Sequence, residues 1–504
     1  MKDYTPLSKD TCVPVDDDKP ITVTESSVAQ KLSQISISKT GGPDNLPNWV
    51  LKEYAYILAP AVTDIINTSF QECKVPSAWK MAGVPPIPKK RSIEDLNKDL
   101  RPLSLTSTLS KVAESYIIEK DLKPTLLKSM DPQQYGFIPR SCTTFALISM
   151  IHHWLKLTDG TGSTVRVSLL DYRKAFDLVD HNLLIAKLFS LGVKPTVVNW
   201  ITDFLRERYQ RVTISSESYS SLKLVPAGIP QGTKIGPWLF LAMINDLNIS
   251  QPTMSMWKFA DDTTVSEVIP KGDSSKLQET IHEIANWSRN NKFQLNPSKC
   301  KELIINFTKQ SVIEDPIKMN DLPFETVSQA KILGVTITKD LKWNVHIEDI
   351  IQRASKRIYL LRQLKKADVE SCSLVKFYCA CIRSILEYSC QVFHTSLPQY
   401  LTEELERIQK RSLRIIFPDL SYKDAIGKAN IGTLFDRRET LCEKLFSQIE
   451  VTNDNEKHKL WNLLPPRHTT SVYDLRQNRV YLLPKVKTNR YKNCFILHHA
   501  AKAF

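Results

Sequence analysis

The chain has 504 residues, of which 42% are hydrophobic, and its 68 lysines and arginines exceed its 54 acidic residues by a formal net charge of +14. That length and apolar content allow several subdomains with their own cores. The charge favours a polyanionic partner, nucleic acid before membrane, over a protein that is merely basic. Ten cysteines in so long a chain exclude a dense disulfide framework. No apolar run suggests a secretion signal or a membrane span, so we expect a soluble intracellular protein.

The chain opens on a polar stretch. Residues 1–38 are rich in Ser, Thr, Asp and Lys without a sustained apolar period, which predicts a disordered linker or tail. A turn-dense segment follows at residues 39–47, and apolar residues then recur at helical spacing over residues 50–66.

Two basic stretches interrupted by prolines come next, at residues 84–91 and 99–105. Because proline breaks a helix, they predict a strand–loop–strand that carries Lys89, Lys90 and Arg101. Arginine and lysine suit phosphate oxygens, although a solvated basic loop would have the same composition.

Carboxylates then appear at two places that predict strand ends. A β-type run at residues 165–170 ends in Asp171, with Phe176 five residues later. Further on, an aromatic-rich run reaches Asp261 and Asp262 and continues into β-branched residues, which predicts two strands with the acid pair at or beside their turn. An Asp-Asp pair alone is usually only a surface turn.

Between the two lies the loop Ala-Gly-Ile-Pro-Gln-Gly at residues 227–232, which taken alone would more often be a plain turn. Its glycines would let the backbone approach a bound ligand closely. The flanking segments read as helices, at residues 181–191 and 196–209 before the loop, and with Leu277, Ile281 and Ile284 on one face after the acid pair.

In this order, the strand-end acid, the loop and the acid pair resemble the palm of reverse transcriptases. The segments at residues 39–47 and 488–495 resemble the opening and closing segments of non-LTR (LINE-like, jockey-type) retrotransposon enzymes, so the likeness runs from about residue 39 to the end. Two departures are Asn45, where the family has glycine, and Thr233-Lys234-Ile235, where it commonly has Ser-Val-Leu.

The resemblance implies an α+β fold of the right-hand polymerase class. Its expected parts are fingers at 39–160 with 195–235 contributing, a palm with an antiparallel sheet at 161–340, a basic helical thumb at 341–450 and a C-terminal segment at 451–504. The thumb agrees with apolar residues at helical spacing from Ile347 to Leu361.

The resemblance also implies roles for individual residues. Asp171, Asp261 and Asp262 would be catalytic and would hold two Mg²⁺ ions, for which Mn²⁺ can substitute. The other implied roles are Lys299 beside the leaving pyrophosphate, Arg101 and Lys89 (or Lys90) on the triphosphate, Phe176 excluding a 2′-OH, Gln231 and Gly232 at the nucleotide, and Leu333 and Gly334 in the primer grip. Core packing for Phe176 and a solvated surface for the lysines are the plain alternatives.

We therefore expect an RNA-directed DNA polymerase with an RNA template, a DNA primer and dNTPs as partners, no membrane partner, and residence in the nucleus or cytoplasm. The alternative is a domesticated, inactive nucleic-acid-binding protein derived from such an enzyme. A group II intron or retron type enzyme is a third reading, which the closing segment disfavours.

Overall fold

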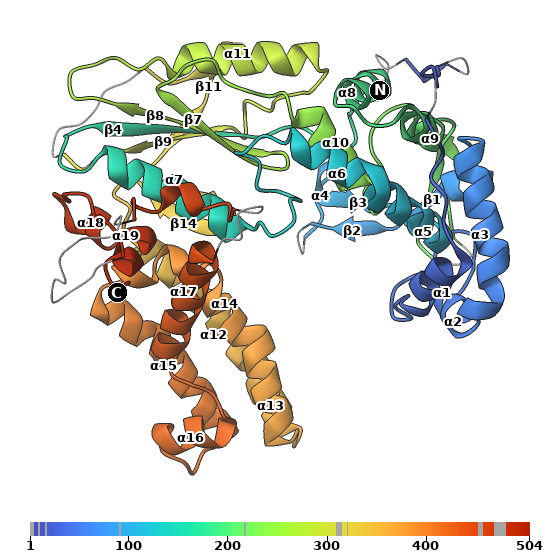
Figure 1. The fold of residues 1–504 in the computed structure, drawn as a ribbon. Helices are drawn as coiled ribbons and strands as arrows, with labels where there is room; N and C mark the ends of the chain where they lie inside the picture. Colours follow the sequence, from blue (N-terminus) through green and yellow to red (C-terminus); the bar gives the residue numbers. More distant parts are fainter. Residues whose placement is uncertain are drawn as a thin grey trace, which may run out of the picture. The chain divides into compact units, whose positions relative to one another are not determined.

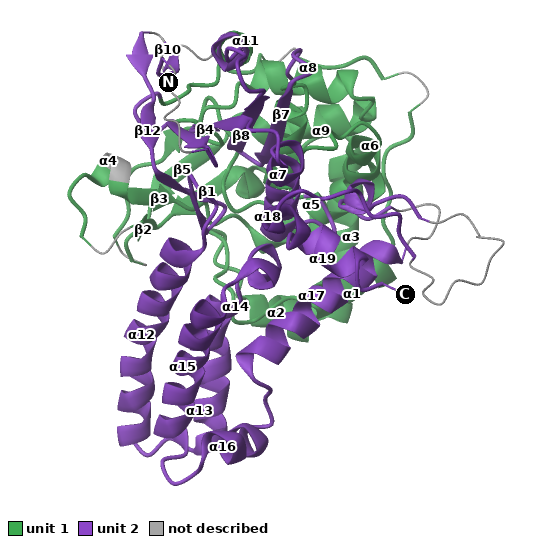
Figure 2. Cartoon of the chain, turned by 90° about the vertical axis from the view of Figure 1, so that its left-hand side faces the viewer, with its two compact units in different colours: residues 1–137, 172–248, 283–296 green, residues 138–171, 249–282, 297–504 purple. Residues whose placement is uncertain are grey.

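The structure is a computed structural model that describes residues 5–8, 11–15, 18–89, 92–215, 218–308, 315–319, 321–451, 457–467 and 480–503. The chain divides into two compact units that both collect separate stretches of sequence (Figure 2). Unit 1 comprises residues 1–137, 172–248 and 283–296, and unit 2 comprises residues 138–171, 249–282 and 297–504.

Unit 1 is mostly helical, with two small sheets. Its helices are α1 (Glu25–Ser33), α2 (Asn48–Glu53), α3 (Ala55–Gln71), η1 (Ser77–Lys80), α4 (Leu96–Asp99), α5 (Thr108–Ile117), η2 (Ile118–Leu122), α6 (Lys123–Lys128), α8 (His181–Ser190), α9 (Pro195–Leu205) and α10 (Gly236–Ile244). Its strands are β1 (Met81–Val84), β2 (Pro86–Pro88), β3 (Leu100–Pro102), β5 (Tyr209–Val212) and β6 (Lys223–Leu224), in sheets of order β1-β5-β6 and β2-β3. The expected strand–loop–strand is thus confirmed as the antiparallel pair β2–β3.

The predicted linker at residues 1–38 is wrong over Glu25–Ser33, which forms α1. Thr24 caps this helix, since its side chain accepts a hydrogen bond from the Ser27 N–H. Val28 and Leu32, four residues apart, are completely buried, and α1 packs on α3 (Figure 1). Only three residues of α1 form its buried apolar face, so the polar composition of the segment concealed the helix.

The helix expected at residues 196–209 ends early, because α9 stops at Leu205. Glu207 adopts a positive φ of 50°, and the buried Arg208 guanidinium donates back to the Phe204 carbonyl at 2.9 Å. Tyr209 can then start β5. The helix at 181–191 is confirmed as α8, whose first turn is capped by Asp180.

Unit 2 is built on a five-stranded sheet of order β12-β9-β4-β8-β7, in which β4 is central (Figure 1). The strands of this unit are β4 (Thr164–Leu170), β7 (Met254–Phe259), β8 (Asp262–Ile269), β9 (Lys301–Ile305), β10 (Lys318–Met319), β11 (Leu322–Pro323), β12 (Glu325–Val327), β13 (Gln329–Ile332) and β14 (Val335–Thr338). Strand β4 runs antiparallel to both β8 and β9. Helix α7 (Thr143–Leu157) packs on β7, and the indole N–H groups of Trp154 and Trp257 donate to Ser266 and Ser149 at 3.0 Å.

After the sheet, unit 2 becomes helical. Its helices are α12 (Asn344–Lys366), α13 (Ser371–Phe377), η3 (Tyr378–Arg383), α14 (Ser384–Glu387), η4 (Cys390–Val392), η5 (His394–Ser396), α15 (Gln399–Ile416), α16 (Tyr422–Ala429), α17 (Leu434–Glu450), η6 (Trp461–Leu463), α18 (Asn489–Lys492) and α19 (Phe495–Ala500). The predicted arc from Ile347 to Leu361 is the buried face of α12, which packs on α15.

Helix α11 (Leu277–Asn290) spans the boundary between the units, and Leu277, Ile281 and Ile284 are completely buried, as their spacing predicts. All the cysteines are free. The mixture of helices with a largely antiparallel sheet, in which β12 alone runs parallel to its neighbour β9, confirms the α+β class. Among the described residues, no helix is both long enough and apolar enough to cross a membrane.

Candidate active site

The three aspartates meet at one end of the central sheet of unit 2. Strand β8 pairs with β4 so that Thr263 faces Leu170, which brings Asp262 next to Asp171 across the two strands. Strand β7 pairs with β8 through Phe259 and Asp262, and Ala260 and Asp261 form the two-residue turn. Ala260 has a φ of 57°, as tight hairpins require. The predicted hairpin with the acid pair at its turn is confirmed.

The three carboxylates interact electrostatically. The Asp262 residue has an exposed surface, but protein atoms surround its carboxyl group. Desolvation of this group is therefore the largest cause of its pKa shift. Desolvation, followed by the negative charges of Asp261 and Asp171, raises the pKa of Asp262 to about 6. A cation would relieve this repulsion.

These oxygen donors fit a hard divalent cation. Mg²⁺ and Mn²⁺ favour carboxylates and retain coordination sites for water and substrate phosphates. Within the described part of the chain, no three His, Cys, Asp or Glu side chains form a ready-made metal cluster.

Lys299 lies beside these acids. Its Nζ is 4.0 Å from Asp171 Oδ2, and its side chain is 69% exposed. The register explains this position, because Lys301 at the start of β9 faces Leu169 of β4, two residues before Asp171. The Asp171 backbone N–H also donates to Cys300 Sγ at 3.4 Å. The structure thus brings Lys299 to the acid site, while its chemical role stays a prediction.

In unit 1, the Gly-Ile-Pro-Gln-Gly loop packs on the segment that follows β4. The backbone N–H groups of Gly228 and Ile229 donate to Val179 and Phe176 at 2.8 and 2.7 Å. The Gln231 side-chain amide donates to Asp177 Oδ1 at 3.0 Å.

Neighbouring backbone atoms leave no room for a side chain at either glycine of the loop. A Cβ on Gly228 would lie 2.5 Å from the Asp177 carbonyl oxygen, and one on Gly232 would lie 2.3 Å from that of Ser104. Gly232 also has a φ of 131°. We expected these glycines to make room for a nucleotide. This explanation is wrong, because the space that a side chain would fill at each glycine is occupied by the backbone of Asp177 or Ser104.

Asp177 lies in a turn and is not a free surface acid. It is partly buried, it accepts the Gln231 hydrogen bond, and burial raises its pKa against the opposing effects of Gln231 and of the charges of Lys174 and Lys89. Its position directly after Phe176 was the only signal in the sequence. A carboxylate that fixes Gln231 is the residue that sequence reasoning missed.

Phe176 is partly buried in an aromatic cluster. Its ring stacks on Phe240 with centroids 4.2 Å apart and meets the edge of Phe137 at 6.2 Å. Part of the Phe176 ring is therefore buried by core packing, which is the plain alternative role for this residue. Its role at the sugar stays a prediction.

Arg101 and Lys89 belong to the β2–β3 pair, and both are exposed. Arg101 faces Ile87 in the register, and the Lys89 backbone N–H donates to the Asp99 carbonyl at 2.7 Å. Lys90 lies outside the described residues. The backbone thus holds Arg101 within β3 and Lys89 directly after β2.

The predicted primer-grip hairpin is β13–β14, whose turn residues Leu333 and Gly334 have φ values of 45° and 87°. Two positive φ angles are typical of a tight type I′ turn. The Tyr388 hydroxyl donates to the Leu333 carbonyl at 2.8 Å, and a Cβ on Gly334 would lie 2.9 Å from the Tyr388 ring. The space beside Gly334 is occupied by Tyr388, a contact that the sequence did not reveal, and the role of this turn at the primer stays a prediction.

Comparisons with known proteins found two matching families and several similar proteins. Residues 87–337 match the family described as "Reverse transcriptase (RNA-dependent DNA polymerase)", and residues 343–384 match "Alkylated DNA repair protein alkB homolog 8, N-terminal". The chain is 27% identical to "Probable RNA-directed DNA polymerase from transposon BS" of Drosophila melanogaster, over 79% of this chain and 45% of that protein. It is 24% identical to "RNA-directed DNA polymerase from mobile element jockey" of the same species, over 87% of this chain and 49% of that protein.

The chain thus spans about half the length of these curated relatives. Among solved structures, apo telomerase from Candida Tropicalis is similar over 80% of this chain and 76% of that one, with 13% identity and a TM-score of 0.40. A score that low carries no argument about the site.

Proposed function

We propose, from the premise that residues 87–337 belong to the reverse transcriptase family and share its right-hand polymerase fold, that this chain is an RNA-directed DNA polymerase of the non-LTR retrotransposon type. Its substrates would be dNTPs, an RNA template and a primer that ends in a 3′-OH, inside the nucleus or cytoplasm. The observation that carries this proposal is the meeting of Asp171 with the turn of Asp261 and Asp262 at one sheet end.

Reverse transcriptases depend on divalent metal ions, and the finer proposal is that Asp171, Asp261 and Asp262 hold Mg²⁺. When bound, such ions lower the pKa of the attacking hydroxyl and neutralise the leaving pyrophosphate. The acids themselves would orient the ions, since Asp171 directly follows β4, Asp261 directly precedes β8, Asp262 begins β8, and backbone hydrogen bonds set the register of these two strands.

Cationic side chains would serve the phosphates. Lys299 would hold a proton at Nζ for the leaving pyrophosphate, and its exposed side chain leaves that proton accessible. Arg101 and Lys89 would bind the triphosphate, for which the planar guanidinium offers paired donors.

The remaining residues would position the nucleotide. Phe176, held by stacking on Phe240, would exclude a 2′-OH, and Gln231 would present an amide oriented by Asp177. Gly232 would keep the loop in place, and Leu333 and Gly334 would support the primer.

Primer extension on an RNA template tests the assignment. Asp261→Asn should lower the extension rate by about a thousandfold or more, because metal ions contribute several kcal/mol to such reactions. RNA binding should persist. Asp273→Asn, the same chemical change in an exposed turn after the far end of β8, serves as the control and should extend primers normally. Normal extension by Asp261→Asn would refute the site.

A catalytically inactive nucleic-acid-binding protein is the alternative function. The presence of all three aspartates together with Arg101 and Gln231 disfavours it. Wild-type protein that binds RNA but incorporates no dNTP with Mg²⁺ or Mn²⁺ would support that alternative.

A further inference from the structure

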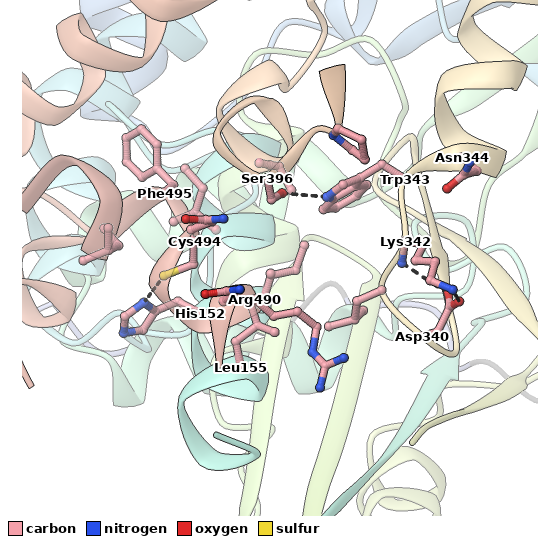
Figure 3. Close-up of a pocket in the computed structure, with 18 of the residues that line it drawn as sticks. His152, Leu155, Asp340, Lys342, Trp343, Asn344, Ser396, Arg490, Cys494 and Phe495 are labelled. Atoms are coloured by element: carbon pink, nitrogen blue, oxygen red, sulfur yellow. Dashed lines mark hydrogen bonds and ion pairs between the residues drawn. The ribbon is translucent and has the colours of Figure 1, made fainter. Parts of the chain in front are cut away.

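Unit 2 contains a pocket of about 380 Å³ that none of the three aspartates lines. Its walls come from helix α7, the loop at residues 340–344, residues 392–400 and the C-terminal segment at residues 489–496 (Figure 3). This volume lies in the range of about 300–1,000 Å³ that is typical of small-molecule sites. The pocket gives a role to the closing segment, which the proposed polymerase chemistry leaves unexplained.

The inner walls are apolar and include one large flat ring. Ile148, Ile151 and Leu155 of α7 line one side. Trp343 is 6% exposed, and its indole N–H donates to Ser396 Oγ at 2.7 Å, which fixes the plane of the ring. Figure 3 shows Trp343 above, and Leu155 and Arg490 side by side below it. Such a space suits a planar aromatic ligand.

The rim is polar and carries Arg490 together with an ion pair between Lys342 Nζ and Asp340 Oδ2, 3.2 Å apart. The Arg490 guanidinium lies 3.8 Å from the ring centroid of Phe307, and no described acidic residue forms an ion pair with it. Asn489 and Asn493 also line the pocket, and their side-chain amides have no hydrogen-bond partner among the described residues. An amide offers both a donor and an acceptor, which is the pattern found on the edges of nucleobases.

The closing segment is held rigidly in place. The Thr488 backbone N–H and hydroxyl both donate to Asp159 Oδ1, at 2.8 and 2.6 Å. The Thr395 hydroxyl donates to the Asn493 carbonyl at 2.7 Å, and the buried Cys494 thiol lies 3.6 Å from His152 Nδ1. Because these contacts order the segment without a ligand, the rim is pre-organised.

We propose that this pocket binds one unpaired nucleotide of an RNA strand, with its base against Trp343, its base edge on Asn489 and Asn493, and its phosphate on Arg490. The inference rests on the proposed function only in taking RNA as the partner. Arg490 has no ion-pair partner among the described residues, which favours a nucleotide over an apolar peptide side chain, since the latter would leave the charge without a counterion.

Photo-crosslinking locates the ligand directly. Single-stranded RNA that carries one 5-iodouridine would be irradiated with the full chain in EDTA, and the modified peptides would be identified by mass spectrometry. We expect the crosslink on Trp343 or on Tyr400, whose hydroxyl accepts from the Asn344 amide at 2.6 Å at the pocket edge. Excess uridine monophosphate that abolishes the crosslink would identify a free nucleotide as the ligand instead of a strand.

Two variants provide the matched comparison. Arg490→Gln should weaken RNA binding by about tenfold, as expected for the loss of a charge-assisted contact. Arg289→Gln, the same change at an exposed position of α11, should have little effect. Leu155→Trp should fill the pocket and remove the crosslink, with folding checked by thermal unfolding.

Equal RNA affinities for the two arginine variants, or crosslinks confined to other peptides, would overturn the proposal. Because the assay contains neither Mg²⁺ nor dNTPs, its outcome is separate from that of primer extension. Asp261→Asn should still crosslink, so a failed polymerase assignment would leave this result standing.

Discussion

Asp262 begins β8 directly after the turn residue Asp261 and faces the end of β4 at Asp171. Neither backbone geometry nor packing requires an acid at an exposed strand start. Desolvation and the two neighbouring carboxylates raise its pKa to about 6, so in the absence of metal this residue disfavours the folded state once it ionises. Residues that cost stability in this way are typical of functional sites.

This cost predicts a pH dependence of stability. The pKa of Asp262 is higher in the folded protein than in the unfolded chain. Its contribution to the free energy of unfolding is therefore fully present below pH 3.8 and is lost as the pH rises through about 6. Without metal, Asp262→Asn should therefore match the wild type near pH 4 and exceed its free energy of unfolding above pH 6. Urea unfolding in EDTA at both pH values measures the difference.

At pH 7.5, added Mg²⁺ should raise the melting temperature of the wild type more than that of Asp262→Asn. Asp273→Asn is the control and should follow the wild type throughout. A stability difference between Asp262→Asn and wild type that does not change with pH would contradict the electrostatic coupling.

Gly232 offers a second test at the residue scale. Its φ of 131° and the 2.3 Å approach to the Ser104 carbonyl predict that Gly232→Ala lowers the free energy of unfolding by about 3 kcal/mol or more, since strain and steric clash add. Gly192 has a φ of 80°, but no atom lies within 4 Å of the position that a Cβ would take. Gly192→Ala therefore isolates the backbone strain and should lower the free energy of unfolding by about 1 kcal/mol. Equal costs in urea unfolding would show that the close contact is relaxed.

At the scale of elements, α1 shows how a short helix escapes compositional reasoning. Only three of its nine residues are buried, and polar residues dominate its sequence. A helix this short is marginal in isolation and depends on tertiary packing. Its contact with α3 supplies that packing, and Lys31 adds an ion pair to Glu119 at 2.7 Å.

Packing of α1 therefore predicts a measurable loss on truncation of its buried side chain. Leu32→Ala should lower the free energy of unfolding by about 2–5 kcal/mol, as for other fully buried leucines. Gln30→Ala on the exposed side of the same helix should change it by less than about 0.5 kcal/mol. If residues 1–38 were a linker, neither variant would differ from the wild type in urea unfolding.

At the scale of the whole molecule, the chain passes repeatedly between its two units, so neither unit is one continuous stretch of sequence. Asp171 is the last residue of one stretch of unit 2, and Tyr172 starts the next stretch of unit 1. The predicted boundaries of fingers, palm and thumb remain predictions. A fragment that contains only the region 161–340 would omit α7, which packs on β7.

The net charge of +14 predicts salt-sensitive RNA binding. Affinity for single-stranded RNA should fall by at least about tenfold between 50 and 200 mM salt, which corresponds to about three phosphate contacts. Fluorescence anisotropy with an unlabelled competitor measures this slope. Asp261→Asn should give the same slope, because it removes no cation, and affinity independent of salt would refute the electrostatic account.

The sequence by itself determined the local features: the hairpin with Asp261 and Asp262, the strand that ends at Asp171, the β2–β3 pair and the amphipathic α12. Periodicity and turn chemistry act over a few residues, so they can be read from one stretch of chain. Tertiary structure alone decided the burial of α1, the hydrogen bond from Gln231 to Asp177, the cover of Tyr388 over Leu333 and the pocket around Trp343. Each depends on contacts between residues far apart in the chain, and no local pattern encodes such contacts.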